Sequence, residues 1–212
     1  MKKKIEKILQ FVQKPARYCG GELNSVIKDP KKVDLRYAFC FPDLYEIGMS
    51  HLGMKILYSL VNSREDAWCE RVFAPDADME EQMRKNDVKL FALESEDDVK
   101  EFDIVGFTLM YELCYTNVLN MLDLAGIPLL SKDRTDLTPI IACGGPCACN
   151  PEPIADFVDL VFLGDGEEST MQVLDLLKEC KKNGNSKHEF LMKAKDIRGV
   201  YVPSFYEDTY HD

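Results

Sequence analysis

The residues of this chain that are best suited to binding or chemistry lie in short loops that follow apolar runs. The first loop carries Asp43, Tyr45 and Gly48, spaced D-x-Y-x-x-G, directly after the run LRYAFCF. Its carboxylate and phenol can both form hydrogen bonds with a ligand. A later pair, Gly144–Gly145, follows PIIAC, and the absence of Cβ atoms would let a flat ligand approach the backbone closely. The alternative for this pair is a tight turn before Pro146.

Three further positions extend this set. Thr108 lies in the run DIVGFTLM, and its hydroxyl can bond the tail of a nucleotide or be satisfied by nearby backbone. Met110 follows two residues later. Gly164 ends the run VDLVFL and opens the acidic sequence GDGEE. Amides at such a helix start can hold an anion. The adjacent carboxylates oppose phosphate, however, and acids at a helix N-terminus need no ligand.

An α/β sheet is the arrangement that would bring these loops together. Apolar runs predict six strands, at residues 35–41, 67–74, 89–93, 103–110, 139–143 and 158–163. Helices are predicted between them, because strands separated by helices imply parallel pairing through right-handed crossovers. We therefore expect a doubly wound, mostly parallel sheet of the Rossmann-like or flavodoxin-like class. In such sheets the loops at the carboxyl ends of the strands form the ligand crevice.

Apolar spacing also predicts the individual helices. One helix follows Gly48, with a buried stripe of Met49, Leu52, Gly53, Ile56, Leu57 and Leu60. The others are predicted at residues 3–12, 79–84, 97–101 and 115–124, then after Gly164 and after Lys187. Asp76 or Asp78 is expected to cap the helix at 79–84, and Gly126 to close the helix at 115–124.

The same patterns suggest three parts of the chain. Residues 1–34 form a helical arm that we expect to pack on a sheet edge or on a neighbouring domain. Residues 35–186 form the α/β domain. Residues 187–212 form a C-terminal extension, in which 199–206 is expected to begin the first strand of a further unit.

Composition excludes some functions. The formal net charge is -11, from 37 acidic and 26 basic residues, so most of the surface would repel phosphate backbones and direct nucleic-acid binding is not expected. The sequence has neither a signal peptide nor an apolar run long enough to span a membrane, and we therefore expect a cytoplasmic protein. Its eight cysteines, scattered along the chain, are expected to be reduced thiols.

Five segments together resemble the N-terminal portion of a family of uncharacterised radical S-adenosylmethionine (radical SAM) proteins with a cobalamin-binding-like domain. These segments are FPDLYEIGMSHLG, ERVFAPDADME, GFTLMYELCYTNVLNMLDLAGIP, GGPCACNPEP and FVDLVFLGDGEE, and the match spans roughly residues 15–205. In that family a radical SAM barrel with a CxxxCxxC motif follows this region. The resemblance implies that such a barrel, outside the 212 residues, holds the 4Fe-4S cluster and S-adenosylmethionine and is the domain's partner. Cys143, Cys147 and Cys149 miss the cluster spacing by one residue.

The resemblance also implies a cofactor. Cobalamin-binding domains of this fold class mark their crevice with D-x-H-x-x-G, S-x-L and G-G, which correspond here to Asp43-x-Tyr45-x-x-Gly48, Thr108–Met110 and Gly144–Gly145. Tyr45 replaces the cobalt-ligating His, and a phenol with an ordinary pKa near 10 is a poor cobalt donor. Cobalamin is therefore expected to bind without His ligation. His51 is expected to lie one turn into a helix and to point away from the loop.

Two functions remain open from the sequence. In the first, the domain presents cobalamin to the barrel or shapes its substrate cleft, and is not catalytic alone. In the second, it is a structural or interaction domain that has lost the cofactor, with Tyr45 and Met110 closing the crevice. An FMN or nucleotide carrier is disfavoured, because FPDLYEIG lacks the Ser, Thr and Gly donors that phosphate requires. The first two differ in whether the groove above the first loop, Thr108 and Gly144–Gly145 is open.

Overall fold

The computed structural model describes residues 2–207 and 209. In this part of the chain six strands form one sheet in the order β2-β1-β3-β4-β5-β6. They are β1 (Leu35–Phe41), β2 (Ala67–Phe73), β3 (Ile104–Thr108), β4 (Ile140–Gly144), β5 (Leu160–Phe162) and β6 (Val200–Tyr201). The first five are parallel, and β6 is antiparallel to β5. The predicted α/β class and mostly parallel sheet are confirmed.

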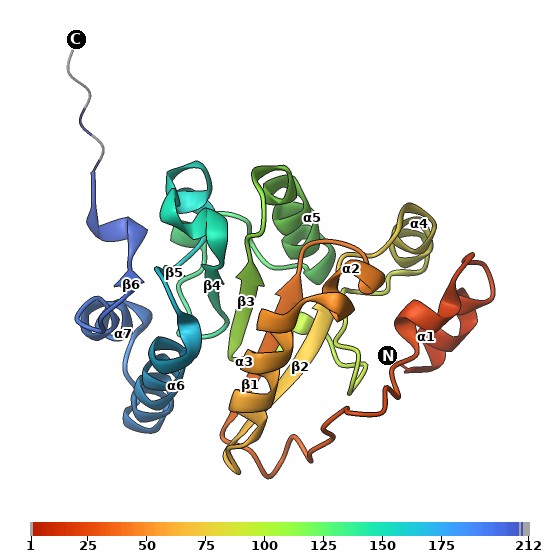
Figure 1. The fold of residues 1–212 in the computed structure, drawn as a ribbon, viewed down its shortest axis with the longest axis horizontal. Coiled ribbons are helices and arrows are strands. Elements are labelled where there is room, and N and C mark those ends of the chain that lie inside the picture. Colours follow the sequence, from red (N-terminus) through yellow and green to blue (C-terminus); the bar gives the residue numbers. More distant parts are fainter. Residues whose placement is uncertain (1, 208, 210–212) are drawn as a thin grey trace.

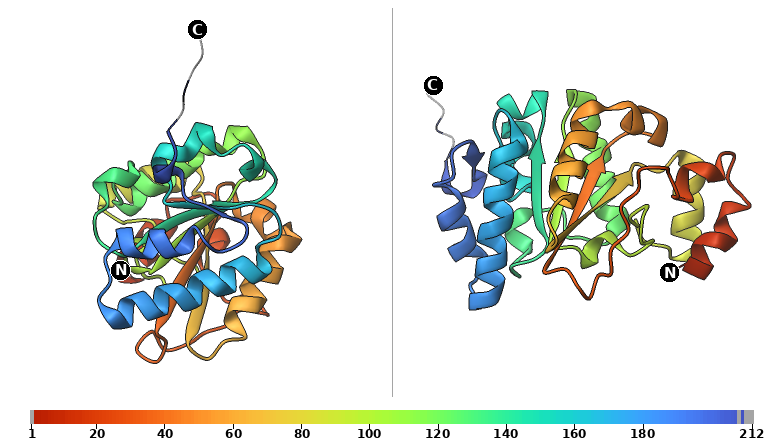
Figure 2. Two further views of the ribbon diagram at one scale, coloured as in Figure 1. Left: turned by 90° about the vertical axis from the view of Figure 1, so that its left-hand side faces the viewer. Right: turned by 60° about the horizontal axis from the view of Figure 1, so that its bottom comes forward.

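Helices cover both faces of the sheet, as Figures 1 and 2 show. One face packs against α3 (Leu52–Asn62), α6 (Gly166–Asn183) and α7 (Lys187–Ala194). The other packs against α1 (Lys2–Leu9), α4 (Ala77–Asn86) and α5 (Tyr115–Ala125). The short helix α2 (Tyr45–Ser50) directly follows the β1 loop. Because both faces are covered, the strands are nearly continuous apolar runs rather than alternating ones.

Short 3-10 turns occupy much of the remaining chain. They lie at Pro15–Tyr18, Val99–Glu101, Glu112–Cys114, Ser131–Asp133, Pro146–Cys149, Glu152–Phe157 and Pro203–Phe205. The predicted helix ends are confirmed where side chains or glycine determine them. The Asp76 side chain accepts a hydrogen bond from the Ala77 amide at the start of α4, and Gly126 ends α5 with φ +68°. None of the described helices is long and apolar enough to cross a membrane.

The predicted strand at residues 89–93 is wrong. This segment is irregular, with a single antiparallel bridge between Phe91 and Asp98. The Leu93 amide donates to the Arg71 carbonyl of β2 at 2.8 Å, and side chains make further contacts along this outer edge. The Arg71 amide donates to the Glu94 carboxylate at 2.7 Å, and the Ser95 amide donates to the Glu70 carboxylate at 3.0 Å. The edge of β2 is thus covered by carboxylates, which also hinders pairing with another chain.

The predicted helix after Gly48 is in fact two helices. His51 has an extended backbone (φ -78°, ψ 118°) and separates α2 from α3. Because α3 restarts after this break, its buried stripe is Met54, Tyr58 and Val61. The predicted stripe is wrong, since Leu52 is 68% exposed.

Described segments near both ends of the chain contact this sheet or the helices packed on it. Within residues 199–206, which the sequence predicts to begin a further unit, Val200–Tyr201 pairs with β5 and a 3-10 turn follows. At the other end, Ile5 and Ile8 of α1 are buried in the same apolar cluster as α4. The helix predicted at 3–12 is shorter than expected, and the one at 97–101 is a single 3-10 turn.

Candidate functional site at the carboxyl edge of the sheet

A cavity of about 720 Å³ lies beside the carboxyl ends of β3, β4 and β5. Its walls include Gly53 and Leu57 of α3 and Gly166 and Thr170 of α6, so the N-terminal halves of these two helices border it. Four of the residues singled out from the sequence line it: Thr108, Gly144, Gly145 and Gly164. The groove above Thr108 and Gly144–Gly145 is therefore open.

The glycines at this edge differ in what the structure requires of them. Gly145 has φ +101°, and a Cβ there would lie 2.9 Å from the Leu109 carbonyl oxygen, so the close approach of the β3 and β4 loops requires glycine. Gly164 has φ +87°, and a Cβ there would meet no atom within 4 Å. Gly144 has no such backbone requirement, and its Cβ would lie 3.4 Å from the Phe162 Cβ. A side chain at either position would lie at the cavity wall, and at Gly164 it would also strain the backbone because φ is positive.

Tyr37 and Gly106 form a part of the cavity wall that sequence reasoning missed. The Tyr37 ring crosses from β1 to β3, where a Cβ on Gly106 would lie 2.0 Å from the Tyr37 hydroxyl oxygen. Burial raises the pKa of Tyr37 well above its ordinary value, so this phenol stays neutral. A glycine inside a buried strand often marks such a close approach, and this signal was present in DIVGFTLM.

His51 also lines the cavity, which corrects the expectation that it points away. It is the N-cap residue of α3, and its Nδ1 accepts a hydrogen bond from the Met54 amide at 3.1 Å. Its ring packs 5.4 Å from the ring of Phe41. Burial lowers the pKa of His51. The side chain is therefore held in one orientation by the helix that it caps.

Tyr45 lies apart from the cavity, on the β2 side of the sheet. Its hydroxyl donates to Glu22 Oε1 at 3.0 Å, and its ring packs 5.3 Å from the ring of Phe73. Burial and the adjacent Glu22 carboxylate raise the pKa of Tyr45. The phenol is thus kept neutral and occupied, and it does not close the crevice.

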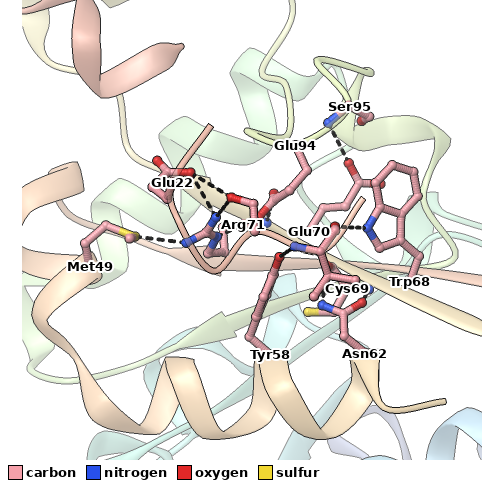
Figure 3. Close-up of polar contacts among 12 residues, drawn as sticks. Glu22, Met49, Tyr58, Asn62, Trp68, Cys69, Glu70, Arg71, Glu94 and Ser95 are labelled. Atoms are coloured by element: carbon pink, nitrogen blue, oxygen red, sulfur yellow. Dashed lines mark hydrogen bonds and ion pairs between the residues drawn. The ribbon is translucent and has the colours of Figure 1, made fainter. Parts of the chain in front are cut away.

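Glu22 connects Tyr45 to a buried cluster around Arg71 (Figure 3). Arg71 donates to Glu94 at 2.6 Å and to Glu22 at 3.0 Å, and its guanidinium lies 4.8 Å from the centre of the Tyr58 ring. Desolvation raises the pKa of Glu94, while Arg71 opposes that rise. The cluster fastens the N-terminal arm to β2, and its charges are already paired with one another.

Asp43, Gly48 and Met110 shape the loops around the cavity without lining it. Tyr111 donates a hydrogen bond to Asp43, which joins the loops after β1 and β3. A Cβ on Gly48 would lie 2.4 Å from the Phe73 ring, so this glycine lets α2 pack closely on the sheet. Met110 places its sulfur 3.7 Å from the Thr108 hydroxyl.

The charge of the cavity limits what it can bind. Asp165 and Glu167 line it, and no Lys or Arg does so among the described residues. Cys143 is buried and Cys149 is exposed in the same wall. Nowhere in the described part of the chain do three His, Cys, Asp or Glu side chains come together as metal ligands. The lining therefore disfavours a phosphate or another anion.

These residues fit one part of cobalamin and not another. The glycine-lined wall can accept the flat, uncharged base at the end of the cobalamin tail. Cobalt ligation does not fit, because Tyr45 is a neutral phenol bound to Glu22. His51 does not fit either, since its Nδ1 already accepts the Met54 amide, so a neutral ring carries its proton on Nε2. Neither Tyr45 nor His51 is therefore placed to act as a ligand to cobalt.

Comparison with known sequences identifies the family. The profile described as "Radical SAM proteins, N-terminal" matches residues 53–203, which is most of the chain. The chain belongs to this family. This radical SAM N-terminal domain is also similar to an uncharacterised protein of Methanocaldococcus jannaschii, with 26% identity over 176 residues. That match covers 82% of the chain but only 33% of the relative's length. No solved structure matches the chain.

Proposed function

We propose that this radical SAM N-terminal domain is the cobalamin-binding module of a larger radical SAM protein. The open cavity of about 720 Å³ beside Gly144–Gly145 carries the proposal, because it lies at the carboxyl edge where ligands bind in doubly wound sheets. Thr108 and Gly164 line the same cavity. In this function the cavity holds the base end of the cobalamin tail, and the cobalt has no ligand from this chain.

Each part of the chain has a defined task in this proposal. The glycines let the base lie against the backbone, and Thr108 offers a hydroxyl beside it. Tyr37 and Leu57 supply apolar walls that exclude water. Cobalamin, when bound, supplies cobalt–carbon chemistry that no side chain provides. The 4Fe-4S cluster, S-adenosylmethionine and the catalytic step belong to a barrel in the remainder of the protein.

A purely structural role is less well supported by the geometry. That role requires side chains to fill the crevice, and Tyr45 and Met110 were the candidates. Tyr45 is held by Glu22, and neither residue lines the cavity. A volume of this size, open to solvent and bordered by glycine, favours a ligand site.

The proposal is tested by titrating the 212-residue chain with hydroxocobalamin and methylcobalamin, followed by absorbance and calorimetry. Gly164→Leu and Gly184→Leu form a matched pair of variants. Both glycines have positive φ (+87° and +67°), and neither would bring a Cβ within 4 Å of another atom. The backbone strain is thus similar, but only Gly164 borders the cavity.

We expect wild type and Gly184→Leu to bind with similar affinity and a base-off spectrum, and Gly164→Leu to bind at least about tenfold more weakly, a loss near 1.4 kcal/mol. Thermal unfolding should show comparable stability for the two variants. Equal binding by all three proteins would exclude this cavity as the site. No binding by wild type up to about millimolar cofactor would contradict the proposed function for this chain.

A further inference from the structure

His51 offers one hydrogen-bond donor to the cavity that its own helix does not use. Nδ1 accepts the Met54 amide at 3.1 Å, and an acceptor nitrogen carries no proton. The neutral ring must then carry its proton on Nε2. No residue in the described part of the chain accepts a hydrogen bond from that nitrogen, and His51 lines the cavity.

The surroundings keep the ring in this form. N-capping of α3 holds Nδ1 in place, because the cap satisfies an amide that would otherwise lack a partner at the start of the helix. Burial lowers the pKa of His51, so the ring is neutral at physiological pH. Protonation of Nδ1 would also remove the acceptor that the Met54 amide needs.

We propose that His51 is a ligand-binding residue of the cavity, which donates from Nε2–H to an uncharged acceptor on the bound molecule and does not coordinate metal. The acceptor class is a ring nitrogen or a carboxamide oxygen, both of which a cobalamin tail can provide. Metal coordination through Nε2 would require a proton on Nδ1 and the loss of the cap. This inference rests on the proposed function, since it assigns a contact within the same site.

The first test determines the tautomer of His51 in the absence of any ligand. Long-range ¹H–¹⁵N correlation spectra of the labelled 212-residue chain separate Nδ1 and Nε2 by chemical shift. The chain has three histidines, so the His51→Asn spectrum assigns the His51 signals by their loss. We expect the proton on Nε2 at neutral pH. A proton on Nδ1 would overturn the inference, because Nε2 would then be a free metal ligand.

The second test measures the contribution of the proposed His51 hydrogen bond to ligand affinity. Asn is a strong N-cap residue whose side-chain oxygen can replace Nδ1, but it lacks the ring Nε2 donor, whereas Leu lacks both groups. With hydroxocobalamin as the probe, we expect His51→Asn to keep the wild-type unfolding temperature and to bind about fivefold more weakly, the loss of one hydrogen bond. His51→Leu should lose affinity and stability together.

The two proposals fail in different ways. Wild-type binding that His51→Asn leaves unchanged would overturn the role of His51 while the cavity remains a cobalamin site. A change in the visible cobalt spectrum on His51→Asn would overturn it as well, since that change reports a cobalt–imidazole bond. Failure of the wild-type chain to bind hydroxocobalamin would contradict the proposed function itself.

Discussion

At the scale of single residues, the carboxyl edge of the sheet depends on several glycines, and each position requires glycine for a different structural reason. Gly145 allows two loops to approach each other, Gly48 allows α2 to pack on the sheet, and Gly106 makes room for the Tyr37 ring. Gly145 and Gly48 both lie in motifs that the sequence marks as ligand loops, yet Gly145 lines the cavity and Gly48 does not. A glycine is therefore informative about function only after its neighbours are known.

Gly106→Ala should destabilise the protein by about 2 kcal/mol, because the added Cβ would lie 2.0 Å from the Tyr37 hydroxyl in a packed core. Urea unfolding of Gly106→Ala, Tyr37→Leu and the double variant measures the effect. We expect the double variant to lose about 1 kcal/mol less free energy of unfolding than the two single variants lose together, since Leu at position 37 relieves the clash. Additive losses would show that Tyr37 and Gly106 do not compete for this space.

Of the eight residues singled out from the sequence, four line the cavity, whereas Asp43, Tyr45, Gly48 and Met110 do not; His51 lines it against expectation. Thr108, Gly144, Gly145 and Gly164 could be found because strand ends in a parallel sheet share one edge. Tyr45 was misplaced because its partner, Glu22, lies 23 residues earlier in an arm with no recognisable pattern. His51 was misplaced because a histidine N-cap breaks one apparent helix into two, and apolar spacing alone does not register the break.

At the scale of elements, a buried carboxylate holds the edge of the sheet together. Asp159, just before β5, accepts from Arg134 at 2.9 Å and from Lys187 of α7 at 2.7 Å. Its other oxygen accepts the Ile141 amide of β4 at 2.7 Å. Burial lowers the pKa of Lys187, and the Asp159 carboxylate opposes that shift.

Asp159→Asn should cost about 3–5 kcal/mol, because two buried cations lose their counter-ion. Lys187→Met is the matched control, since it removes one cation and leaves Arg134 paired with Asp159; its cost should be less than half as large. Guanidinium unfolding followed by circular dichroism measures both losses. A similar loss in the two variants would mean that Asp159 acts through packing rather than through charge.

A second ion pair gives the fold a predictable acid sensitivity. Asp66, before β2, accepts from Arg64 at 2.9 Å and from Lys178 of α6 at 2.6 Å. The Arg64 hydrogen bond, with help from Lys178, holds the pKa of Asp66 well below its usual range. A lowered folded pKa stabilises the native state above the unfolded value near pH 4, and this contribution is lost as the pH falls below it.

Asp66→Asn should therefore lower stability by about 1 kcal/mol at pH 7, with a smaller difference from wild type at pH 3. Urea unfolding at the two pH values measures this. Asp175→Asn removes the more exposed partner of Arg64 and should change stability less. A difference that grows toward acid pH would contradict the assigned direction of the Asp66 shift.

Comparison of the predicted and observed strands shows which sequence patterns were sufficient to predict a strand. Five predicted strands were confirmed because buried parallel strands are continuous apolar runs bounded by turns. The run KLFAL is equally apolar, yet it forms no strand: the Leu93 amide donates to the Arg71 carbonyl, but the Glu94 carboxylate accepts the Arg71 amide in place of a second backbone bond. Side-chain competition for backbone groups over such sequence distances leaves no local pattern to detect.

At the scale of the whole molecule, the sheet order places the loops after β3, β4 and β5 around one cavity. Helices α3 and α6 form its sides, and the N-terminal arm is fastened to β2 by the Arg71 cluster. The chain covers about a third of the length of its archaeal relative.

In the proposed function, the cavity binds the cobalamin tail and leaves cobalt without a protein ligand. The most direct measurement is a crystal structure of the chain grown with hydroxocobalamin, in which anomalous scattering locates cobalt. We predict the tail base beside Gly144–Gly145, His51 Nε2 within hydrogen-bond distance of a ligand acceptor, and no protein nitrogen bonded to cobalt. Cobalt bound to His51, or cobalamin bound away from this cavity, would contradict the account.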